Sequence, residues 1–366
     1  MKVSTTRMKE AVNKVIKGAG NNNLIPITSM IGIKLSDGKL RLLTTDMTNT
    51  VCVIVDKVSG DDLDITVDSD KFSKLVAKTV AEDIDLTVKD DILHVKAGGT
   101  YKIPLISDEE GLVSFPDIES DLSGMGTGWN TVKLSSVMQA YHINRYALSK
   151  TKENQALTGY YCGDHVVTTD ANVITFNQFK MFPFDFPVLI SDRQMELLAT
   201  FNEEDIKVSV DPKSVVFATD TQVLEGELMQ CIDDFPAQEV SAYLDEAFTS
   251  CCTVSKDLLL GTLDRLALFI EPYDKNGAYF TFGRKGINIY SKKGASTETI
   301  NYIESKDFQP FTCCVEIPVF KEQLQAIPQD SVKIYYGNEN AIKLECGKVL
   351  QVMALLEDDG IDSLRE

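Results

Sequence analysis

Residues 69–88 read SDKFSKLVAKTVAEDIDLTV and residues 191–210 read SDRQMELLATFNEEDIKVSV, so the chain repeats itself after 122 residues. Each copy starts with an Asp-led helical pattern and ends in the alternation that is typical of a β-strand. Three such lengths make 366 residues, the whole chain. A looser third copy has a helical pattern from Pro318 and a strand pattern over 331–336. The chain is therefore predicted to consist of three copies of one unit.

Further landmarks support three copies and indicate what each contains. Thr44-Thr45-Asp46 recurs as Thr168-Thr169-Asp170, and Phe115-Pro116 recurs as Phe235-Pro236. Each copy reads as a helix, strands, a second helix and more strands, which predicts an α+β fold with two helices packed on antiparallel sheet. A period near 120 residues is the size of a domain. The predicted domains are 1–125, 126–245 and 246–366, with linkers over 120–128 and 241–249, and the runs that begin the domains with a helix are 4–20, 133–148 and 253–269.

The formal charge of −19 is unevenly distributed along the chain. Six helical stretches carry 16 Lys and Arg against seven Asp and Glu, a balance of +9, so the remainder carries −28. These stretches are 2–20, 69–81, 133–152, 191–201, 253–269 and 317–327. Helix propensity alone could enrich Lys and Arg, but Glu shares that propensity and is scarce here. The pattern indicates basic helix surfaces on an otherwise acidic protein, which fits an anionic partner.

The first helix shows how this charge reaches a surface. At 100° per residue its apolar side chains fall on one broad side, and Arg7, Lys14 and Lys17 cluster on the other, with Glu10 among them. The apolar side comprises Met8, Ala11, Val12, Val15, Ile16 and Ala19. One side is expected to pack, and the other to face water or an anionic partner.

Residues that could support catalysis are not arranged for it. The three histidines are unclustered, and none of the usual metalloprotease, hydrolase, phosphate-loop or EF-hand motifs is present. The eight cysteines include no C-x-x-C spacing, so reduced structural thiols are favoured over zinc. Paired acids such as Asp61-Asp62 are better explained as turn residues than as Mg²⁺ ligands. The sequence predicts a protein without catalytic residues, metal or cofactor.

Several of these segments together resemble the bacterial sliding clamp, the beta subunit of DNA polymerase III, in divergent form. The resemblance runs from Met1 to about Leu356 and depends on the order and spacing of short motifs more than on identities. Besides the two Thr-Thr-Asp motifs and Phe235-Pro236, the motifs are Leu24-Ile25-Pro26-Ile27, Phe115-Pro116-Asp117 and Leu157-Thr158-Gly159. The resemblance implies a non-catalytic processivity factor for a replicative DNA polymerase. Two chains would join head to tail into a homodimer ring, with helices lining a hole around duplex DNA.

The resemblance also implies which residues face DNA without reading its sequence. They are the basic or amide side chains of the first two domains' helical stretches, although some could simply be solvated helix surface. The expected residues are Arg7, Lys14, Lys17, Asn22, Asn23, Lys71, Lys74, Lys78, Arg145, Lys150 and Lys152.

In the resembled family, polymerase and clamp loader dock through short peptides in a groove between the second and third domains. The matching positions here are Leu157, Thr169, Asp170, Ala171, Asn172, Val173, Ile174, Pro236, Val240, Val352, Met353, Ala354, Leu355 and Leu356. The chain departs from the family pattern: Ala171-Asn172-Val173 replaces Gly-His-Arg, Gln155-Ala156 replaces paired tyrosines, and residues 357–366 follow as an acidic tail. Such divergence would suit a phage-encoded or otherwise atypical clamp.

The junction of the two chains would use edge strands of the first and third domains and a small apolar contact. The implied residues are Lys71, Leu75, Lys102, Phe269, Ile270 and Glu298. Phe269 and Ile270 could instead belong to the core of the third domain. No signal-peptide pattern follows Met1 and no apolar run is long enough to cross a membrane, so a cytoplasmic protein is expected.

Two other functional classes remain open on the sequence. A structural ring or tube protein, such as a phage tail component, would explain the repeats and the acidity, but not the concentration of basic charge in helices. An enzyme with an unrecognised site would need catalytic residues that no motif reveals. Salt-dependent retention on circular DNA would separate a clamp from both.

Overall fold

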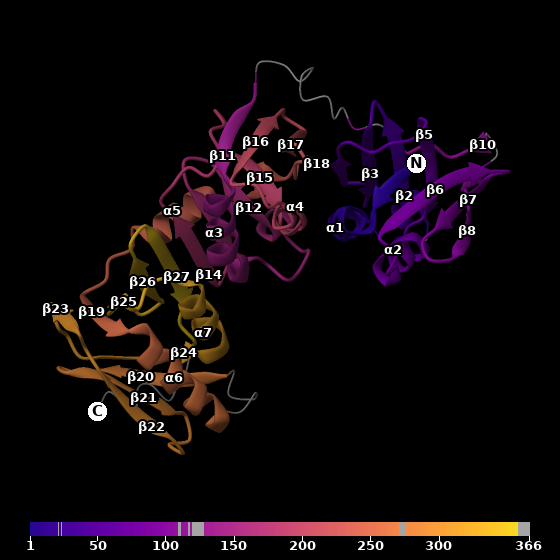
Figure 1. Ribbon diagram of the computed structural model, residues 1–366. Helices are drawn as coiled ribbons and strands as arrows, with labels where there is room; N and C mark the ends of the chain where they lie inside the picture. The colour runs from indigo at the N-terminus through magenta and orange to yellow at the C-terminus, as the bar shows by residue number, and fades with distance from the viewer. Residues whose placement is uncertain are drawn as a thin grey trace. The chain divides into compact units, whose positions relative to one another are not determined.

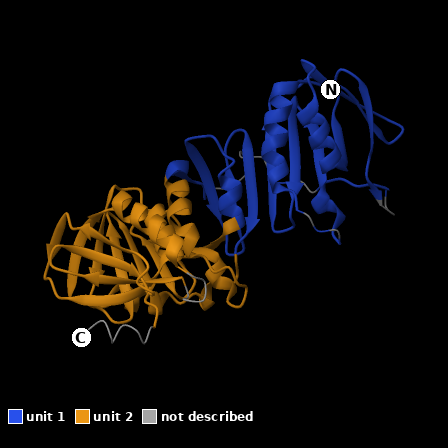
Figure 2. Cartoon of the chain, turned by 90° about the horizontal axis from the view of Figure 1, so that it is seen from below, with its two compact units in different colours: residues 1–135, 193–228 blue, residues 136–192, 229–366 orange. Residues whose placement is uncertain are grey.

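The computed structural model describes residues 1–20, 22, 24–108, 111–115, 118, 128–270 and 276–357. The chain divides into two compact units, one made of residues 1–135 and 193–228 and the other of residues 136–192 and 229–366 (Figure 2). Each unit combines helices with antiparallel sheets (Figure 1), as the sequence predicts.

Two antiparallel sheets form the framework of the first unit. The larger sheet has the strand order β11-β16-β17-β18-β4-β3-β2-β5, and the smaller has the order β1-β6-β7-β8. The strands of the larger sheet are β2 (Met30–Ser36), β3 (Lys39–Thr45), β4 (Asn49–Val55), β5 (Leu63–Asp68), β11 (Asn130–Lys133), β16 (Asp205–Val210), β17 (Ser214–Ala218) and β18 (Gln222–Glu227). Those of the smaller sheet are β1 (Lys2–Ser4), β6 (Asp83–Lys89), β7 (Ile92–Lys96) and β8 (Thr100–Pro104). A short hairpin, β9 (Ser107–Asp108) with β10 (Gly111–Leu112), follows β8.

Helices α1 (Thr5–Val15) and α2 (Ser69–Lys78) pack against each other, and α1 contacts both sheets. The buried side of α1 is the apolar side that the sequence predicts. Helix α2 begins where the carboxylate of Asp68 accepts the backbone N–H of Lys71 at 2.7 Å, which satisfies one of the free donors of the first turn. The single-turn helices of this unit are η1 (Ile16–Gly18) and η2 (Pro26–Ser29), and α4 (Asp192–Leu198) begins at the boundary between the units.

The second unit also contains two antiparallel sheets. The larger has the order β15-β12-β13-β14-β27-β26-β25-β19-β23, and the smaller has the order β22-β21-β20-β24. The strands of the larger sheet are β12 (Gly159–Cys162), β13 (Val166–Thr169), β14 (Val173–Asn177), β15 (Val188–Ser191), β19 (Ser250–Ser255), β23 (Glu304–Lys306), β25 (Ser331–Tyr336), β26 (Ala341–Cys346) and β27 (Val349–Ala354). Those of the smaller sheet are β20 (Gly277–Phe282), β21 (Gly286–Ser291), β22 (Thr297–Asn301) and β24 (Phe311–Glu316).

Helices α6 (Lys256–Leu266) and α7 (Ile317–Ala326) pack against each other between strands of both sheets of this unit. Phe280 and Phe320, both fully buried, meet edge to face in the core that they share, with ring centroids 5.6 Å apart. The other helical segments are α3 (Leu134–Asn144), η3 (Arg145–Ala147), η4 (Gln155–Thr158), η5 (Ile232–Asp234), α5 (Ala237–Leu244) and η6 (Ala267–Phe269).

Two strand pairs join segments that the sequence assigns to different domains. In the first unit β18 pairs with β4, which places Leu224 opposite Val51. In the second unit β14 pairs with β27, which places Ile174 opposite Val352. Sheets are thus continuous across the predicted domain boundaries, and the two compact units each take part of residues 126–245. The division into three domains stays a prediction from the repeat.

Some local expectations were wrong. Residues 253–255, placed in the third opening helix, end strand β19, because the β-branched Thr253 and Val254 favour a strand before Ser255 caps α6. Helix α5 was not anticipated, and its last turn occupies part of the stretch predicted as the second linker, 241–249. The sequence predicts one sheet in each repeat, whereas the described strands form sheets that continue from one repeat into the next and smaller sheets beside them. The first linker over 120–127, Pro116-Asp117 and the tail over 358–366 lie outside the described residues.

Candidate functional site

The cations expected to face DNA on the first helix are on its outer side. Arg7 and Lys17 are exposed and Lys14 is half-buried. Arg7 and Lys14 line an open hollow of about 530 Å³, and the guanidinium of Arg7 donates to the backbone carbonyl of Asp56 there. This helix therefore offers cations that can approach a phosphate, although Arg7 already has an acceptor within the chain.

Helix α2 carries a second group of exposed cations. Lys71, Lys74 and Lys78 are all exposed, and the ammonium of Lys74 pairs with Asp70 at 2.7 Å. The charge of Lys74 is thus partly neutralised by Asp70, and the charges of Lys71 and Lys78 are more available to a partner. Asn22 is exposed, with its side-chain carbonyl accepting the backbone N–H of Leu24 at 3.0 Å, and Asn23 lies outside the described residues.

The cations expected in the second domain surround one open hollow of about 760 Å³. Arg145, Lys150 and Lys152 line it, together with the carboxylates of Asp192 and Glu322. Arg145 lies 3.0 Å from Asp192, and its guanidinium carbon lies 5.0 Å from the centre of the Tyr141 ring. Lys150 and Lys152 are both exposed. The structure thus brings the three predicted residues together, with part of the charge of Arg145 neutralised by Asp192.

The cations on the third domain's helices are engaged within the chain. The ammonium of Lys256 donates to the carbonyl of Ile327 at 2.8 Å, Arg265 pairs with Glu298 at 2.6 Å, and Lys321 pairs with Asp264 at 2.5 Å. Arg265 also keeps the pKa of the Glu298 carboxyl below its ordinary value through their hydrogen bonds. The excess of basic charge on the helices therefore comes from the first two domains.

Four residues of the expected peptide groove meet in one apolar cluster of the second unit. We call it the junction cluster, because it lies where β14 pairs with β27. Its buried members are Ala156, Leu157, Val167, Ile174, Leu189, Phe235, Val240, Ala341 and Val352, and its half-buried members are Tyr161, Phe176, Met229, Cys231, Ile232, Ala237, Leu244 and Phe248. Leu157, Ile174, Val240 and Val352 are thus together, as the resemblance implies.

The remaining groove residues lie elsewhere because side chains alternate along paired strands. Val173 and Met353 belong to the larger core of the second unit, and Leu355 packs against that core. Ala354 is exposed, and its N–H donates to the carbonyl of Asn172 at 2.8 Å. Leu356 is half-buried, and Pro236 immediately precedes α5. The expected peptide residues therefore divide between two surfaces of the same strand pair.

The two Thr-Thr-Asp motifs form the same turn. In each, the first threonine hydroxyl donates to a carbonyl near the end of the preceding helix: Thr44 to Val15, and Thr168 to Asn144 at 2.8 Å. The second threonine accepts the N–H of Met47 or Ala171, residues with φ of 82° and 78°. The repeat of this motif thus has a structural cause, and Thr169, Asp170, Ala171 and Asn172 lie in the second copy.

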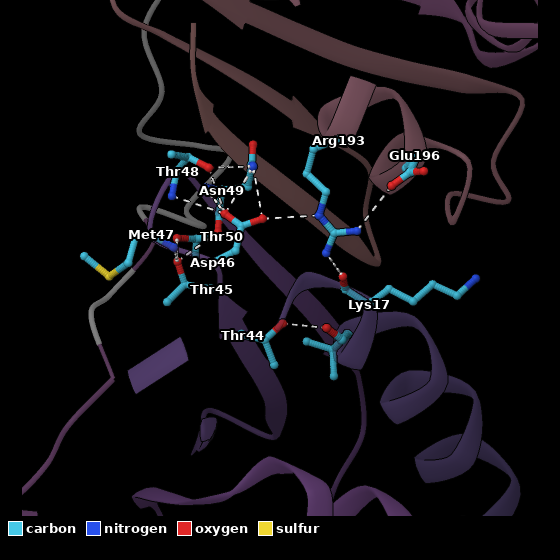
Figure 3. A network of polar contacts seen from close by, with 11 residues as sticks. Lys17, Thr44, Thr45, Asp46, Met47, Thr48, Asn49, Thr50, Arg193 and Glu196 are labelled. Atoms are coloured by element: carbon cyan, nitrogen blue, oxygen red, sulfur yellow. Dashed lines mark hydrogen bonds and ion pairs between the residues drawn. The ribbon is translucent and has the colours of Figure 1, made fainter. Parts of the chain in front are cut away.

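The aspartates of the two turns share the backbone contacts of the turn but differ in their side-chain contacts, and Figure 3 shows those of Asp46. Oδ1 of Asp46 accepts the N–H of Asn49 at 2.8 Å. Likewise, Oδ1 of Asp170 accepts the N–H of Val173 at 2.9 Å. Oδ2 of Asp46 also accepts Nε of Arg193 at 3.2 Å. The same guanidinium donates to the carbonyl of Lys17 and lies 3.5 Å from Glu196. Asp170 has no ion pair with any residue of the described part of the chain.

The residues expected at a junction between chains differ in their availability. Lys71 and Lys102 are exposed, Leu75 is half-buried, and Glu298 is occupied by Arg265 and Thr262. Phe269 is 52% exposed, whereas Ile270 packs against the third domain's core. Leu268, which the sequence did not single out, is 80% exposed. The sequence offered one indication that Leu268 is exposed: it follows Leu266, the last buried residue of α6, by two positions.

The side chains that could bind a metal ion or act as reactive thiols are scattered over the described part of the chain. Those ranges hold no group of three or more His, Cys, Asp and Glu that could bind a metal ion. The eight cysteines are free, and burial raises the pKa of the Cys52 thiol to about 12. None of the described helices has the length and apolar character needed to cross a membrane.

Comparison with known proteins agrees with this architecture. Residues 1–110 match the family model described as DNA polymerase III beta subunit, N-terminal domain. The chain is similar to the DNA polymerase sliding clamp from Bacillus subtilis, with 15% identity, 98% of each chain covered and a TM-score of 0.85. It is also similar to the beta subunit from the DNA polymerase of Streptococcus pyogenes, with 14% identity, 98% and 99% of the two chains covered and a TM-score of 0.85. For the DNA polymerase III beta subunit from Thermotoga maritima the identity is 17%, the coverage 98% and 99%, and the TM-score 0.81.

A search of curated proteins found no match to the sequence. At these identities the structural likeness establishes the fold: the chain has the sliding-clamp fold over nearly its whole length.

Proposed function

We propose that this protein is a DNA sliding clamp, a non-catalytic factor that encircles duplex DNA and holds a replicative DNA polymerase on it. The observation that carries the proposal is the sliding-clamp fold over 98% of the chain, with 98% of the Bacillus subtilis clamp covered in return. The match of residues 1–110 to the beta-subunit model supports it from the sequence. A cytoplasmic location follows from action on DNA in the cell interior.

Contact with DNA would be electrostatic and blind to sequence. Exposed lysines on helices meet phosphates without reading bases, and an acidic exterior repels DNA from other surfaces. The strongest candidates are Lys17, Lys71, Lys78, Lys150 and Lys152, which are exposed and form no ion pair with the described carboxylates. Lys74 and Arg145 would contribute less because Asp70 and Asp192 neutralise them. Arg7, Lys14 and the amides of Asn22 and Asn23 complete the proposed set.

Closure around DNA would require a second copy of the chain, joined head to tail. Two strands at the edges of the described sheets suit such a junction: β8 ends the sheet β1-β6-β7-β8, and β22 ends the sheet β22-β21-β20-β24. The exposed Leu268 and Phe269 would supply an apolar contact beside β22, because α6 packs near that strand. Lys71, Leu75 and Lys102 are the proposed counterparts on the first domain. Glu298 could exchange its bond with Arg265 for a cation of the other copy, and Ile270 would support Phe269 from the core.

Polymerase and clamp loader would dock at the junction cluster. Half-buried apolar side chains beside a sheet suit a short peptide that inserts a few apolar anchors. Leu157, Ile174, Val240 and Val352 are its proposed floor. The turn over 169–172 and the segment 354–356 would border it, and Val173, Met353 and Pro236 would hold these borders in place.

The test is the mass of the native species in solution, followed by its retention on nicked circular and on linearised DNA after loading. A dimer that remains on circles and leaves linear ends is the expected result. A monomer or an open polymer that treats both DNAs alike would overturn the proposal and leave a structural ring or tube protein.

A further inference from the structure

A larger share of the junction cluster is half-buried than of the neighbouring core. Among the described residues it has nine buried and eight half-buried side chains, whereas the larger core of the second unit has 26 buried and seven half-buried ones. Leu244, Met229 and Phe248 are among the half-buried members. Aromatic rings extend the surface: Tyr161 stacks on Phe235 with ring centroids 4.8 Å apart. A partner that covers these half-buried side chains would bury apolar area that now contacts water.

The segment that supplies most of these half-buried side chains is acidic. Residues 214–255 contain eight Asp and Glu and no Lys, Arg or His. Within η5 and α5 the side chains of Ile232, Ala237, Val240 and Leu244 belong to the cluster, and the acids Asp233, Asp234 and Glu239 are exposed. Asp245 and Glu246 follow just beyond α5. The apolar surface is therefore bordered by carboxylates on the same short segment.

The cations near the cluster do not balance these carboxylates. The ammonium of Lys343 donates to the carbonyl of Leu244 at 3.1 Å and lies 4.8 Å from the centre of the Phe248 ring, with Asp245, Glu246 and Glu345 in its surroundings. Lys180 pairs with Asp164 at 3.5 Å. His165 lies against Phe176 with ring centroids 4.5 Å apart, and burial lowers its pKa, which favours the uncharged imidazole. The charge that a docking peptide meets is negative.

The repeated turn gives an independent indication of a missing cation. In the first copy Asp46 receives Arg193 of the same unit. In the second copy Asp170, two residues after Thr168 of β13 and four before Ile174 of the cluster, has no ion pair within the described residues. Asp170 is also the only charged residue among those proposed for the peptide groove. An arginine or lysine of the partner could occupy the place that Arg193 takes in the first turn.

We infer that the partner segment received at the junction cluster is a basic peptide with apolar anchors. The inference rests on the proposed clamp function and specifies the chemistry of its docking partner. Apolar side chains would enter between the half-buried residues, while lysines or arginines would face Asp233, Asp234 and Glu239 and the carboxylate of Asp170 in the turn before Ile174. Complementary charge selects partners and speeds their encounter more than it adds affinity, so an acidic peptide with the same anchors would be rejected.

The experiment uses the full chain and three fluorescein-labelled peptides. In the first peptide Leu and Phe alternate with Lys and Arg, in the second Glu replaces every basic residue, and in the third Ser replaces every apolar residue. We expect the first to bind at least about tenfold more tightly than either of the others at about 0.05 M salt, with the preference over the second reduced at about 0.5 M. Equal or tighter binding of the second peptide would overturn the inference.

Two variants separate docking from general attraction to an acidic protein. The double change Asp233→Lys, Asp234→Lys alters no buried residue and should remove most of the preference for the basic peptide, whereas the matched double change Asp61→Lys, Asp62→Lys should preserve it. Leu244→Asp adds negative charge but should weaken the first peptide about tenfold, because it removes an apolar contact. Undiminished binding to Leu244→Asp would overturn the inference.

Retention on circular DNA, measured on the same preparation, distinguishes the two proposals. A chain that stays on circles but prefers the acidic peptide overturns only the inference about the peptide. If the protein is retained on neither circular nor linear DNA, the proposed clamp function is overturned.

Discussion

Nε of Arg193 donates to Oδ2 of Asp46 across 3.2 Å, although 147 residues separate them in the chain. Asp46 closes a turn of the first domain, and Arg193 belongs to the helical copy of residues 69–88 in the second. The contact therefore joins two repeats within the first compact unit, beside the pairing of β4 with β18. Asp46 makes two kinds of contact, since it also accepts backbone N–H groups of its own turn.

Removing each partner of this pair should have unequal effects. Asp46→Ala is expected to cost about 1 kcal/mol more in free energy of unfolding than Arg193→Ala, because it also leaves the N–H groups of Thr48 and Asn49 without their acceptor. A double-mutant cycle in urea should give a coupling of about 0.5–1 kcal/mol. Glu196→Ala, which removes the weaker contact of Arg193 at 3.5 Å, is the control. Coupling indistinguishable from zero would contradict the prediction.

Two glycines should respond in opposite directions to alanine. A Cβ at Gly226 of β18 would lie 2.4 Å from Nε2 of Gln194 and 2.6 Å from Oδ1 of Asn49, so Gly226→Ala should destabilise by about 1–3 kcal/mol. At Gly261 of α6 the nearest atom is a terminal guanidinium nitrogen of Arg265 at 3.4 Å, so Gly261→Ala should stabilise by about 0.5–1 kcal/mol. Thermal unfolding of both variants measures the difference, and effects of the same sign would contradict the packing described at one of the two sites.

His165 should make stability depend on pH. Burial holds its pKa below the ordinary 6.5, with Asp164 opposing the shift. His165 therefore takes up a proton more readily in the unfolded chain than in the folded one. The stabilisation that neutral His165 gives the folded state is fully present above the unfolded pKa and is lost as pH falls through the folded pKa. His165→Phe should flatten the decline in unfolding free energy below about pH 6.5. Curves recorded from about pH 5 to about pH 8 compare the two proteins, and parallel curves would refute the assignment.

The exposed apolar pair on η6 should affect assembly rather than folding. Leu268→Asp changes a side chain that is 80% exposed, so stability of the single chain should alter by less than about 0.5 kcal/mol. If the chain dimerises as proposed, the same change should shift the native mass from dimer towards monomer. Leu258→Asp, at a position 64% exposed near the start of α6, is the control and should leave the mass unchanged. A variant at Leu268 that remains fully dimeric would exclude this contact.

The lysines around the second domain's hollow should influence the salt dependence of DNA binding. Lys150→Ala with Lys152→Ala is expected to reduce the slope of log affinity against log salt by about 2, one for each phosphate that the protein no longer neutralises. Lys213 and Lys348 lie in turns between strands, at β16–β17 and β26–β27, and their replacement should leave the slope unchanged. Duplex affinity measured over a salt series tests this, and equal slopes for both double variants would remove these lysines from the DNA-facing set.

The fold could be predicted from the sequence where local pattern and repeat agree. The Asp-led segment after Asp68 forms a helix because its apolar positions share one side and a carboxylate caps its first turn. Helix α5 escaped prediction because it has eight residues and no side-chain cap. Residues 253–255 were misassigned because an apolar run can be a strand or a helix until its partner strand, here β25, is known.

The candidate sites were predictable to a lesser degree, since they depend on contacts between distant residues. The sequence suggests Lys150, Lys152 and Arg145 alike as residues that face DNA, but it could not reveal that Asp192 pairs with Arg145. It could not tell that Glu298 bonds to Arg265, nor that the alternation of β14 and β27 sends Val173 and Met353 to a different core from Ile174 and Val352.

The pairing of β4 with β18 and of β14 with β27 has a consequence for how the chain could be shortened or recombined. A fragment cut at residue 125 or 245 would carry an unprotected strand edge in place of each missing ladder. Such fragments should aggregate or swap strands even if their own cores are intact. The hydrogen-bonded strand pairs, rather than the boundaries of the sequence repeat, therefore determine which fragments can exist alone. A viable exchange of segments between relatives would keep both strands of each pair together.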